Sequence, residues 1–485
     1  MKPGKMHFSF LPSLFLPILP LLIGPAWSDL PLITNCTLYD TGVLGVAPNQ
    51  TFLSSPGIVA PRLCVETFDK HAVDKTPFLF FNYIFEGVST PMILRSDDLS
   101  LVYADFESGF PIVSGAQIQN VAGEDSLTFY QGVRERTYGN GVGMVLDKSY
   151  GIRYEVLPID AETDRGVDEH EFWATEEGSV IVEVYETVEG VNLTSVGGPE
   201  VGKIVDSTFQ EINPATGEKL FEWRARDHFD IGDGYFVWNE ERDAELGFEG
   251  FHMNSVSKVD GNYLISSRHF SLIALLDGTT GEIIWVMGGK LNDFQDVSPE
   301  GTALNFAFQH QARIHAGDQL TLFDNHQLAN ARGCTVNCSR AMRLQLDEEA
   351  MTVDLVSEYF HPAGLGSIAM GSHEELESGN VLVSWGSNPT ITEHKESGEA
   401  VMDIRLEPLT GSMRAFYGGN GPYRAFKMDW EGTPSWAPGI AVEGDHVYVS
   451  WNGATEVDRW AVMTSDDPDG PPFLPFVRGN KNAGS

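Results

Sequence analysis

Short apolar runs alternate with clusters of Gly, Asp and Asn along almost the whole chain. Many of the runs are rich in β-branched and aromatic residues, and long segments with the periodicity of an amphipathic helix are missing. The strand-forming runs include 92–106, 125–132, 149–160, 179–188, 262–267, 271–277, 282–289, 319–325, 380–386 and 446–453. The 50 glycines fit the many turns that such a chain needs. The pattern therefore predicts an all-β protein.

A weak repeat joins some of these strands in pairs. Its unit is an apolar strand, a turn close to the form D/N-x-x-T/S-G-E and a second apolar strand, and it occurs at 209–223, 272–285 and 391–404. In such a turn the Gly supplies the positive φ that a hairpin needs. Repeated antiparallel units of this size are typical of β-propeller blades, and the chain length suits six blades. A pair of β-sandwiches is the alternative fold.

The first residues have the order of a secretory signal. Lys2 and Lys5 precede an apolar run from Phe8 to Ile23, and the small residues Ala26 and Ser28 mark a cleavage site. Prolines interrupt the run, and it is shorter than the roughly 20 residues of a membrane anchor, which is the alternative. We therefore expect a secreted or secretory-pathway protein, without a membrane partner after cleavage. The expected domains are a signal peptide at 1–28, an irregular N-terminal segment at 29–80, a six-bladed propeller at 81–470 and a tail at 471–485.

Four cysteines, all beyond the expected cleavage site, indicate disulfides formed in an oxidising compartment. Proximity in the sequence favours the pairs Cys36–Cys64 and Cys334–Cys338 among the three possible connectivities. Sequons for N-glycosylation occur at Asn35, Asn49, Asn192 and Asn337. The cysteines and the sequons both agree with a secreted eukaryotic glycoprotein.

The formal net charge of −38 limits the possible partners. Such a field repels nucleic acid and anionic membranes, so neither is expected to bind. The acidic residues are spread along the chain, which is typical of a solvated surface. A small anionic substrate would need a locally positive pocket, and only the His and Arg clusters of this chain can form one. No cofactor is expected.

Five histidines between Phe251 and His326 lie at the ends of strand-like runs, beside Asn, Gln and Arg. Such imidazoles can bind an anion, pass a proton, hold a metal or act as nucleophiles. In a propeller the inner strands surround one axis, so residues far apart in sequence can meet at the channel mouth. We therefore expect one shared site, formed by His252, His269 and His310 with the substrate-binding residues Asn254, Arg268, Gln309 and Asn325. A structural role is expected for His315, His326, His361 and His394.

Several motifs of this region carry a family resemblance. They include H-x-N-S-V at 252–256, D-G-N-Y-L-I-S-S-R-H at 260–269, T-G-E-I-I-W at 280–285, F-x-F-Q-H-x-A-R at 306–313 and L-F-D-N at 322–325. With further motifs between about Ser126 and Trp460, they resemble the arylsulfotransferase family in its fungal secreted branch. The resemblance implies a six-bladed propeller. It also implies PAPS-independent transfer of sulfate from one phenolic ester to another phenol, through a sulfated histidine.

The resemblance also implies roles for single residues. His252 and His310 match histidines that bind an oxyanion or transfer a proton, and Arg340 or Arg343 matches the arginine of the family's site. The family's sulfated histidine lies late in the chain, where His373 is the candidate by order, in a G-S-H-E-E-L context that matches the motif poorly. If His373 is not the nucleophile, His310 is the other candidate.

Three other functions stay open. The same propeller can steer the cyclisation or isomerisation of a polyketide or terpenoid intermediate by general acid catalysis and shape. Histidines from four blades can hold Fe(II) on a propeller axis, although Asn and Arg neighbours suit an anion better, so no metal is expected. A secreted propeller can also bind a ligand without catalysis.

Overall fold

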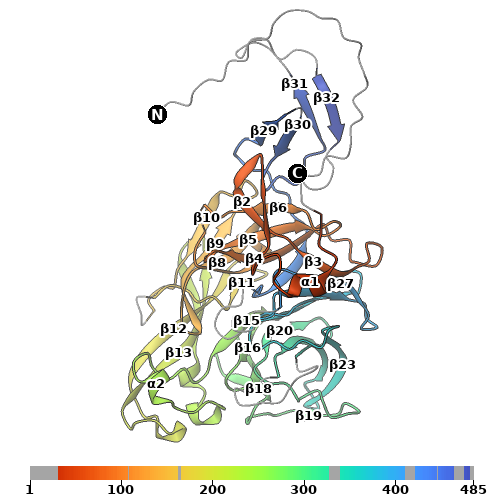
Figure 1. The fold of residues 1–485 in the computed structure, drawn as a ribbon. Coiled ribbons are helices and arrows are strands. Elements are labelled where there is room, and N and C mark those ends of the chain that lie inside the picture. Colours follow the sequence, from red (N-terminus) through yellow and green to blue (C-terminus); the bar gives the residue numbers. More distant parts are fainter. Residues whose placement is uncertain are drawn as a thin grey trace, which may run out of the picture.

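The computed structural model describes residues 31–107, 109–161, 165–326, 339–409, 421–444, 446–463 and 475–480. The predicted signal peptide, Cys334, Cys338 and Asn337 lie outside these residues. Six large antiparallel sheets form the blades of a β-propeller (Figure 1). The predicted fold class, an all-β six-bladed propeller, is therefore confirmed.

Four blades follow one another along the chain. Blade 1 consists of β7 (Ile112–Val121), β8 (Glu124–Glu135), β9 (Tyr138–Leu146) and β10 (Ile152–Val156). Blade 2 consists of β11 (Phe172–Ala174), β12 (Val180–Val191), β13 (Gly202–Asn213) and β14 (Glu218–Arg224). Blade 3 consists of β15 (Met253–Val259), β16 (Asn262–Ser267), β17 (Leu272–Leu276) and β18 (Ile283–Gly288). Blade 4 consists of β20 (His310–His315), β21 (Gln319–Asp324), β22 (Arg340–Asp347) and β23 (Thr352–Phe360), with the short parallel strand β19 (Gln295–Asp296) at its outer edge.

The last two blades combine strands from both parts of the chain, and this closes the ring. Blade 5 consists of β24 (Ser372–Glu375), β25 (Val381–Ser384), β26 (Thr390–His394) and β27 (Ala400–Arg405), with β3 (Cys64–Phe68) at the outer edge. Blade 6 consists of β28 (Ala425–Met428), β4 (Phe78–Phe85), β5 (Val88–Arg95) and β6 (Leu101–Ala104). Strand β3 and the start of β4 fall within 29–80, which the sequence predicts to be irregular. Their pairing partners, β27 and β28, come from the far part of the chain, where local patterns do not reveal them.

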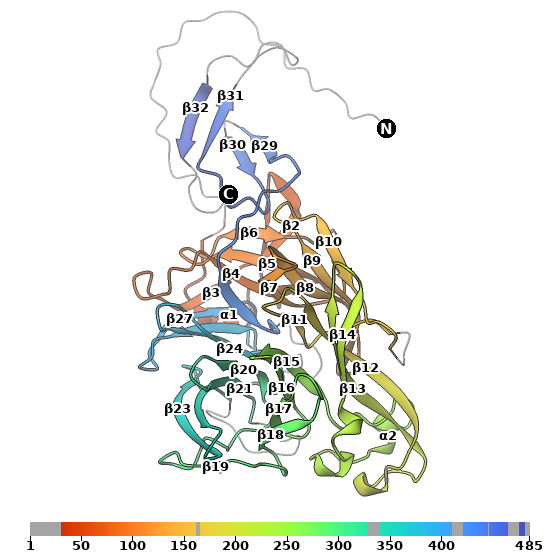
Figure 2. The same ribbon diagram turned by 180° about the vertical axis from the view of Figure 1, so that it is seen from behind.

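The remaining elements lie outside the six blades. They are α1 (Cys36–Asp40), the hairpin of β1 (Asn49–Phe52) and β2 (Ser55–Pro61), the hairpin of β29 (Gly439–Glu443) and β30 (His446–Ser450), the hairpin of β31 (Arg459–Met463) and β32 (Pro475–Asn480), and, between strands of the blades, η1 (Thr194–Val196), η2 (Ala225–Asp227), η3 (Ile231–Asp233) and α2 (Glu240–Asp243). Strands β29 to β32 extend away from the propeller in both views (Figures 1 and 2).

A disulfide fixes the N-terminal elements to the propeller. Cys36 of α1 is bonded to Cys64 of β3, with Cα atoms 5.6 Å apart, so this predicted pair is confirmed. The Cys334–Cys338 pair falls outside the described residues and stays a prediction, as does the use of the sequons. Asn35 and Asn192 are exposed and Asn49 is half-buried. Within the described part of the chain, no helix has the length and apolar character needed to cross a membrane.

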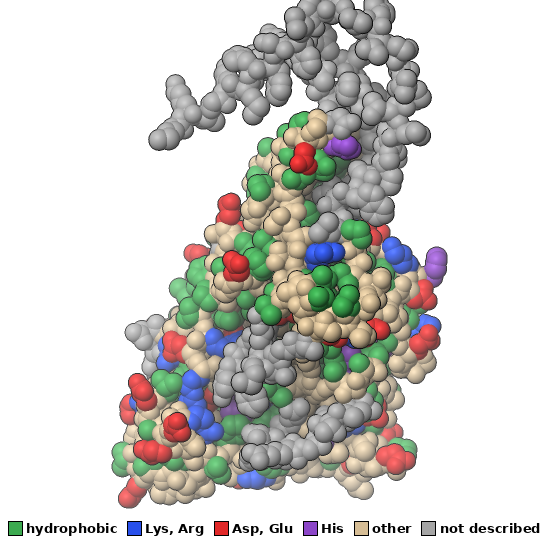
Figure 3. All heavy atoms as spheres, in the orientation of Figure 1, with side chains coloured by type: hydrophobic (Ala, Val, Ile, Leu, Met, Phe, Trp, Pro, Cys, Tyr) green, Lys and Arg blue, Asp and Glu red, His purple; other side chains and the backbone are tan. Residues whose placement is uncertain are grey.

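The apolar core fills the spaces between neighbouring blades. Adjacent residues of one strand serve different interfaces: Leu264 packs toward blade 4, whereas Ile265 packs toward blade 2. Every blade is covered on both faces, which explains why many strands are continuous apolar runs rather than alternating ones. Aspartate and glutamate side chains are scattered over the surface in Figure 3, as the sequence predicts for its acidic residues.

The repeated turn of the sequence connects the third and fourth strands of three blades. Gly217, Gly281 and Gly398 stand at the same place in the β13–β14, β17–β18 and β26–β27 turns, with φ between 70° and 86°. This is the left-handed region, which glycine adopts without steric cost. The turn motif is therefore a true marker of blades 2, 3 and 5.

Candidate active site

The inner ends of four blades meet in one place. His170 lies just before β11, His252 just before β15, and His310 is the first residue of β20. Arg424, directly before β28, links these ends, because its guanidinium donates to the carbonyl oxygens of His170 at 2.9 Å and of Asn254 at 3.1 Å. Side chains from blades 2, 3, 4 and 6 therefore share one site.

Four imidazole rings gather there. The ring centroids of His170 and His252 are 4.8 Å apart, and those of His252 and His269 are 4.6 Å apart. Tyr423 lies between His170 and His310, with centroid distances of 5.8 Å and 6.3 Å. The four histidines are almost fully buried, with 2–5% of each residue exposed. We call His170, His252, His269 and His310 the central histidines.

An oxygen of the protein anchors each central histidine at Nδ1. The anchors are the Asp168 carboxylate for His170, the Glu249 carboxylate for His252, the Glu249 carbonyl oxygen for His269 at 2.9 Å, and the Asn325 side-chain oxygen for His310 at 2.6 Å. An imidazole whose Nδ1–H donates in this way keeps Nε2 for a second partner. The site therefore contains four Nε2 atoms that these anchors do not use.

The tautomer of His310 follows from the hydrogen bonds of Asn325. The Asn325 amide nitrogen donates to the carbonyl oxygens of Ser367 at 3.1 Å and Met370 at 3.0 Å, so its side-chain oxygen faces His310 as an acceptor. Nδ1 of His310 must then carry the proton, and Nε2 carries the lone pair. The Met370 N–H, 3.2 Å from Nε2, fits this assignment.

Burial and neighbouring charges give the rings different pKa values. Burial, with the charge of Arg268 beside it, holds the pKa of His310 well below its ordinary value, so the ring is neutral near pH 7. Burial also lowers the pKa of His252, and that of His269 strongly. For His170, burial opposes the charged ring, but the Asp168 carboxylate outweighs it and raises the pKa. Three neutral rings therefore surround one that favours its charged form.

Arg268 supplies a cation to this site. Its guanidinium lies 4.9 Å from the centre of the Phe308 ring and donates to the Ile368 carbonyl oxygen at 3.1 Å. It forms no ion pair with any residue that the structure describes. Burial lowers the pKa of Arg268 to about 10, which still leaves it charged at neutral pH. An uncompensated guanidinium beside neutral imidazoles suits an anionic ligand.

The backbone next to the central histidines is strained. His252, Phe308, Gln311 and Met370 have φ values of 53°, 55°, 50° and 62°, although none is a glycine. Such conformations cost about 1–3 kcal/mol each and cluster at functional sites, where the surrounding structure enforces them. These four strained residues therefore lie at or next to the central histidines.

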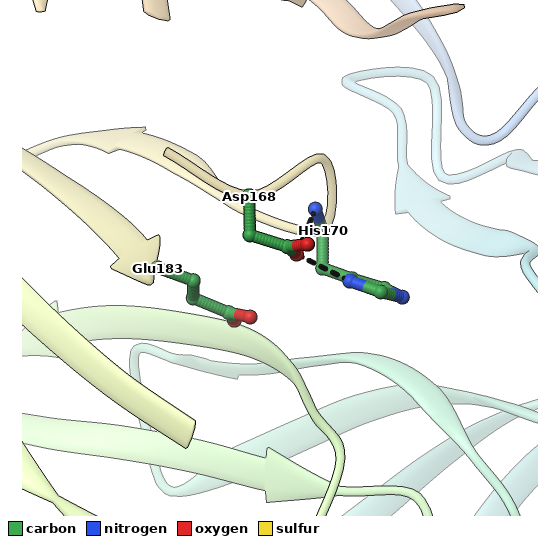
Figure 4. Close-up of side chains that lie close together, drawn as sticks. All are labelled: Asp168, His170 and Glu183. Carbon is green, nitrogen blue, oxygen red and sulfur yellow. Dashed lines mark hydrogen bonds and ion pairs between the residues drawn. The ribbon is translucent and has the colours of Figure 1, made fainter. Parts of the chain in front are cut away.

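One group of side chains at this site can hold a cation. Asp168 and His170 precede β11, and Glu183 lies on β12; potential ligand atoms of the three residues are all within 4.8 Å of one another. Figure 4 shows the carboxylate of Glu183 directed toward the other two side chains. All three residues are buried.

A cavity of about 290 Å³ lies on blade 3, and none of the central histidines lines it. Tyr235, at its edge, donates its N–H to the His269 carbonyl oxygen at 3.0 Å, and the neighbouring Phe236 stacks on the His269 ring with centroids 3.7 Å apart. The cavity is lined by Tyr235, Ser271, Gly288, Gly289, Asn292, Leu304, Asn305, Phe306 and Ala307. Its size is close to the lower limit of small-molecule pockets, about 300 Å³.

His373 lies apart from the central histidines. On β24, its Nε2 is 2.7 Å from a Glu375 carboxylate oxygen and its ring packs against Tyr359, with centroids 6.0 Å apart. The hydroxyl of the preceding residue, Ser372, accepts the Ala425 N–H of the inner strand β28. Successive residues of a strand point to opposite faces, so Ser372 faces blade 6 and the His373 ring faces Tyr359 of blade 4.

Other predicted site residues hold the framework. Arg340 forms ion pairs with Asp324 at 3.1 Å and Glu358 at 2.5 Å, away from the central histidines. The amide nitrogen of Gln309 donates to oxygens of blade 3, and the amide nitrogen of Asn254 donates to the Gln309 carbonyl oxygen at 2.7 Å. The structure thus brings together His252, His269, His310, Arg268 and Asn325, with Asn254 and Gln309 linking the strands beneath them.

Sequence analysis misses His170, Asp168, Glu249 and Tyr423. A signal exists for the first three, because acidic residues stand next to histidine directly before a strand in D-E-H-E-F at 168–172 and E-G-F-H at 249–252. Tyr423 carries no such signal. Its place depends on the pairing of β28 with β4.

Fold and site together define a β-propeller with a buried, histidine-rich anion site at the inner ends of its blades. Residues 117–407, more than half of the chain, match the family model of arylsulfotransferase (ASST). The chain belongs to the arylsulfotransferase family, whose activity implies small phenolic substrates.

No curated protein matches the sequence. Among solved structures, the chain is similar to a protein of unknown function from Bacteroides caccae, with 11% identity and a TM-score of 0.39 over 72% of this chain and 98% of that one. It is also similar to the Cps50 (Swd1) β-propeller domain from Myceliophteria thermophila, with 10% identity and a TM-score of 0.32 over 70% and 97% of the two chains. TolB from Acinetobacter baumannii has 10% identity and a TM-score of 0.36 over 69% and 64%. These likenesses carry no argument about function.

Proposed function

We propose that this chain transfers a sulfuryl group from an aryl sulfate to a phenol, without PAPS, in two displacements through His310. The observation that carries this proposal is the pairing of His310 with Asn325. Because Asn325 accepts a hydrogen bond from Nδ1–H, the lone pair of His310 is on Nε2, which accepts the Met370 N–H at 3.2 Å within a group of imidazoles that also contains Arg268. A neutral imidazole is the nucleophilic form, and the hydrogen bond from Met370 is given up when Nε2 attacks sulfur. His373, whose Nε2 is paired with Glu375, then has a structural role.

In the first displacement, Nε2 of His310 attacks sulfur while the bond between sulfur and the aryl oxygen breaks. The phenolate leaves with the electron pair of that bond and takes a proton from water on release. Arg268 and the Nε2–H of His170 stabilise the negative charge of the sulfuryl oxygens and of the departing phenolate. The cavity beside His269 offers room for the aryl group.

In the second displacement, a phenol takes the place of the first product. His252 takes its proton at Nε2, because the Glu249 carboxylate holds Nδ1–H and stabilises the imidazolium that forms. The phenol oxygen attacks sulfur, the N–S bond breaks, and its electron pair returns to Nε2 of His310. His252 then releases the proton to solvent. The cycle is ping-pong, with sulfated His310 as the intermediate.

We also propose that the protein is secreted. The Cys36–Cys64 disulfide and the predicted signal peptide support it, because disulfides form mainly in oxidising compartments.

Trapping the intermediate tests the mechanism. The purified chain is incubated with nitrophenyl sulfate alone, quenched in alkali, digested and analysed by mass spectrometry. We expect one sulfuryl group on the peptide that contains His310, and its loss when a second phenol is added. A sulfuryl group on the His373 peptide, or turnover without a labelled histidine, would contradict the proposal. A chain that turns over no aryl sulfate would favour the cyclisation or binding alternatives.

A further inference from the structure

Two buried carboxylates, those of Asp168 and Glu183, lie beside His170, and Asp168 pairs with that ring. Asp168 and Glu183 are both 0% exposed, and the Asp168 N–H donates to the Glu183 carbonyl oxygen at 2.8 Å, which ties the two segments together. Neither carboxylate forms an ion pair with a lysine or arginine in the described part of the chain. Burying two such charges is expensive unless a counter-charge or a proton compensates.

The neighbouring acids differ in this respect. Glu169 is paired with Arg134 at 2.5 Å. Glu171 accepts from Arg313 at 2.7 Å and from Arg424 at 2.6 Å, so two guanidinium groups compensate its negative charge. Asp168 and Glu183 thus lack the guanidinium partner that Glu169 and Glu171 have, and Asp168 is paired with the His170 ring alone.

Glu183 is the second observation that points to a ligand. Both of its carboxylate oxygens are buried, and neither accepts a hydrogen bond from any residue that the structure describes. Buried polar atoms nearly always have a partner, so each exception calls for an explanation. In Figure 4 these oxygens are directed toward the carboxylate of Asp168 and the ring of His170.

We propose that Asp168, His170 and Glu183 bind one divalent transition-metal cation, Mn²⁺ or Zn²⁺. Two carboxylate oxygens balance the charge of the ion, and one imidazole nitrogen favours a transition metal over Mg²⁺ or Ca²⁺. The ion takes the place of the Nδ1 proton of His170, which is released to solvent, as is usual when a histidine becomes a ligand. This differs from the sequence-based expectation that the chain holds no metal.

The bound ion would hold the His170 ring in one orientation, so that His170 acts as a positioning residue. With Nδ1 bound to metal, the neutral ring keeps its other proton on Nε2, so Nε2 is a hydrogen-bond donor toward the central histidines. Asp168 and the cation then hold the ring between blade 2 and His252, whose ring centroid is 4.8 Å away. The proposal concerns metal binding and does not depend on sulfate transfer.

Metal binding by the full chain tests this proposal. The chain is purified without chelator, its metal content is measured by plasma mass spectrometry, and chelator-treated chain is titrated calorimetrically with Mn²⁺ and with Zn²⁺. We expect about one equivalent of Mn²⁺ or Zn²⁺ and a rise in Tm when the ion is added. A chain that binds neither ion and shows no rise in Tm overturns the proposal, whatever its sulfotransferase activity.

Two variants locate the ion. Glu183→Gln removes one ligand charge and is expected to weaken metal binding by about 100-fold. Glu211→Gln is the matched control, since Glu211 is a buried carboxylate of the same blade whose oxygens accept from Ser179 and Tyr263. Its affinity should stay within threefold. Equal metal affinities of Glu183→Gln and Glu211→Gln overturn the proposal. If Glu183→Gln does not fold, Glu183→Asp takes its place, and unchanged metal binding by that variant also overturns the proposal.

Discussion

Two groups of buried histidines in this propeller differ in what surrounds their rings. The central histidines are anchored at Nδ1, and their rings lie beside one another, with Tyr423 next to His170 and His310. In blade 5, Nε2 of His373 pairs with Glu375 at 2.7 Å and Nε2 of His394 with Thr392 at 2.8 Å, and both rings pack against Tyr359. Both groups are buried, and Nδ1 of His373 has no hydrogen-bond partner among the described residues. A ring nitrogen without a partner therefore does not by itself make a buried histidine a candidate for chemistry, whereas a group of anchored imidazoles with a cation beside it does.

Replacing one histidine of each group by alanine gives the largest expected difference in activity. His310→Ala should lower kcat for transfer from nitrophenyl sulfate to a phenol by 1,000-fold or more, on the order of the losses seen for removed nucleophiles. His373→Ala should leave kcat within threefold but lower the free energy of unfolding by about 2 kcal/mol, because a buried hydrogen-bonded ring is lost. Steady-state kinetics and denaturant unfolding measure the two quantities. If His373→Ala lost activity and His310→Ala kept it, the assignment of the two groups would be reversed.

The fold could be predicted because its signals are local. Apolar runs, turn glycines and the T-G-E repeat each lie within one hairpin, and they define blades 2, 3 and 5 directly. Ring closure is not local, since β28 pairs with β4 and β27 with β3 across most of the chain. The sequence therefore indicates the number of blades better than their membership.

The candidate site was predictable only in part, for the same reason. His252, His310 and Arg268 stand in motifs at strand ends, and a propeller brings such ends together. The difference between Ser372 and His373 rests on one position of strand register, which decides whether a side chain faces blade 6 or blade 4. His170 was missed because its motif precedes a strand of only three residues, β11.

One arginine beside each histidine group offers the next test. Arg268→Ala removes a cation without an acidic partner among the described residues and should lower kcat by about 100-fold, the scale of a lost transition-state donor. Arg343→Ala is the control, since Arg343 pairs with Glu375 at 2.8 Å beside His373. It should change kcat by less than threefold. Equal losses in both variants would mean that Arg268 does not act on the transferred group.

Changing the anchor of His310 should move the pH dependence of turnover. Asn325→Asp places a carboxylate at Nδ1, which favours the charged ring and raises the pKa of His310 by about 1–3 units. The protonated ring has no lone pair, so the acid limb of the pH–kcat profile should shift to higher pH by a similar amount. Asn262→Asp, at the first residue of β16, is the control and should leave the limb in place. An unshifted limb in Asn325→Asp would show that His310 is not the titrating nucleophile.

The smallest expected effect concerns stability in blade 5. Burial raises the pKa of Asp403 on β27 to about 6, with Arg405 only partly opposing it, and one carboxylate oxygen has no hydrogen-bond partner among the described residues. The unfolded chain loses this proton near pH 4, whereas the folded chain keeps it until about pH 6, so Asp403 lowers stability as the pH rises between these values. Asp403→Asn should therefore raise the free energy of unfolding by about 1–2 kcal/mol at pH 7.5, and by much less at pH 4, without altering kcat. Urea unfolding at the two pH values measures this difference. An equal effect at both would show that Asp403 stays ionised in the fold.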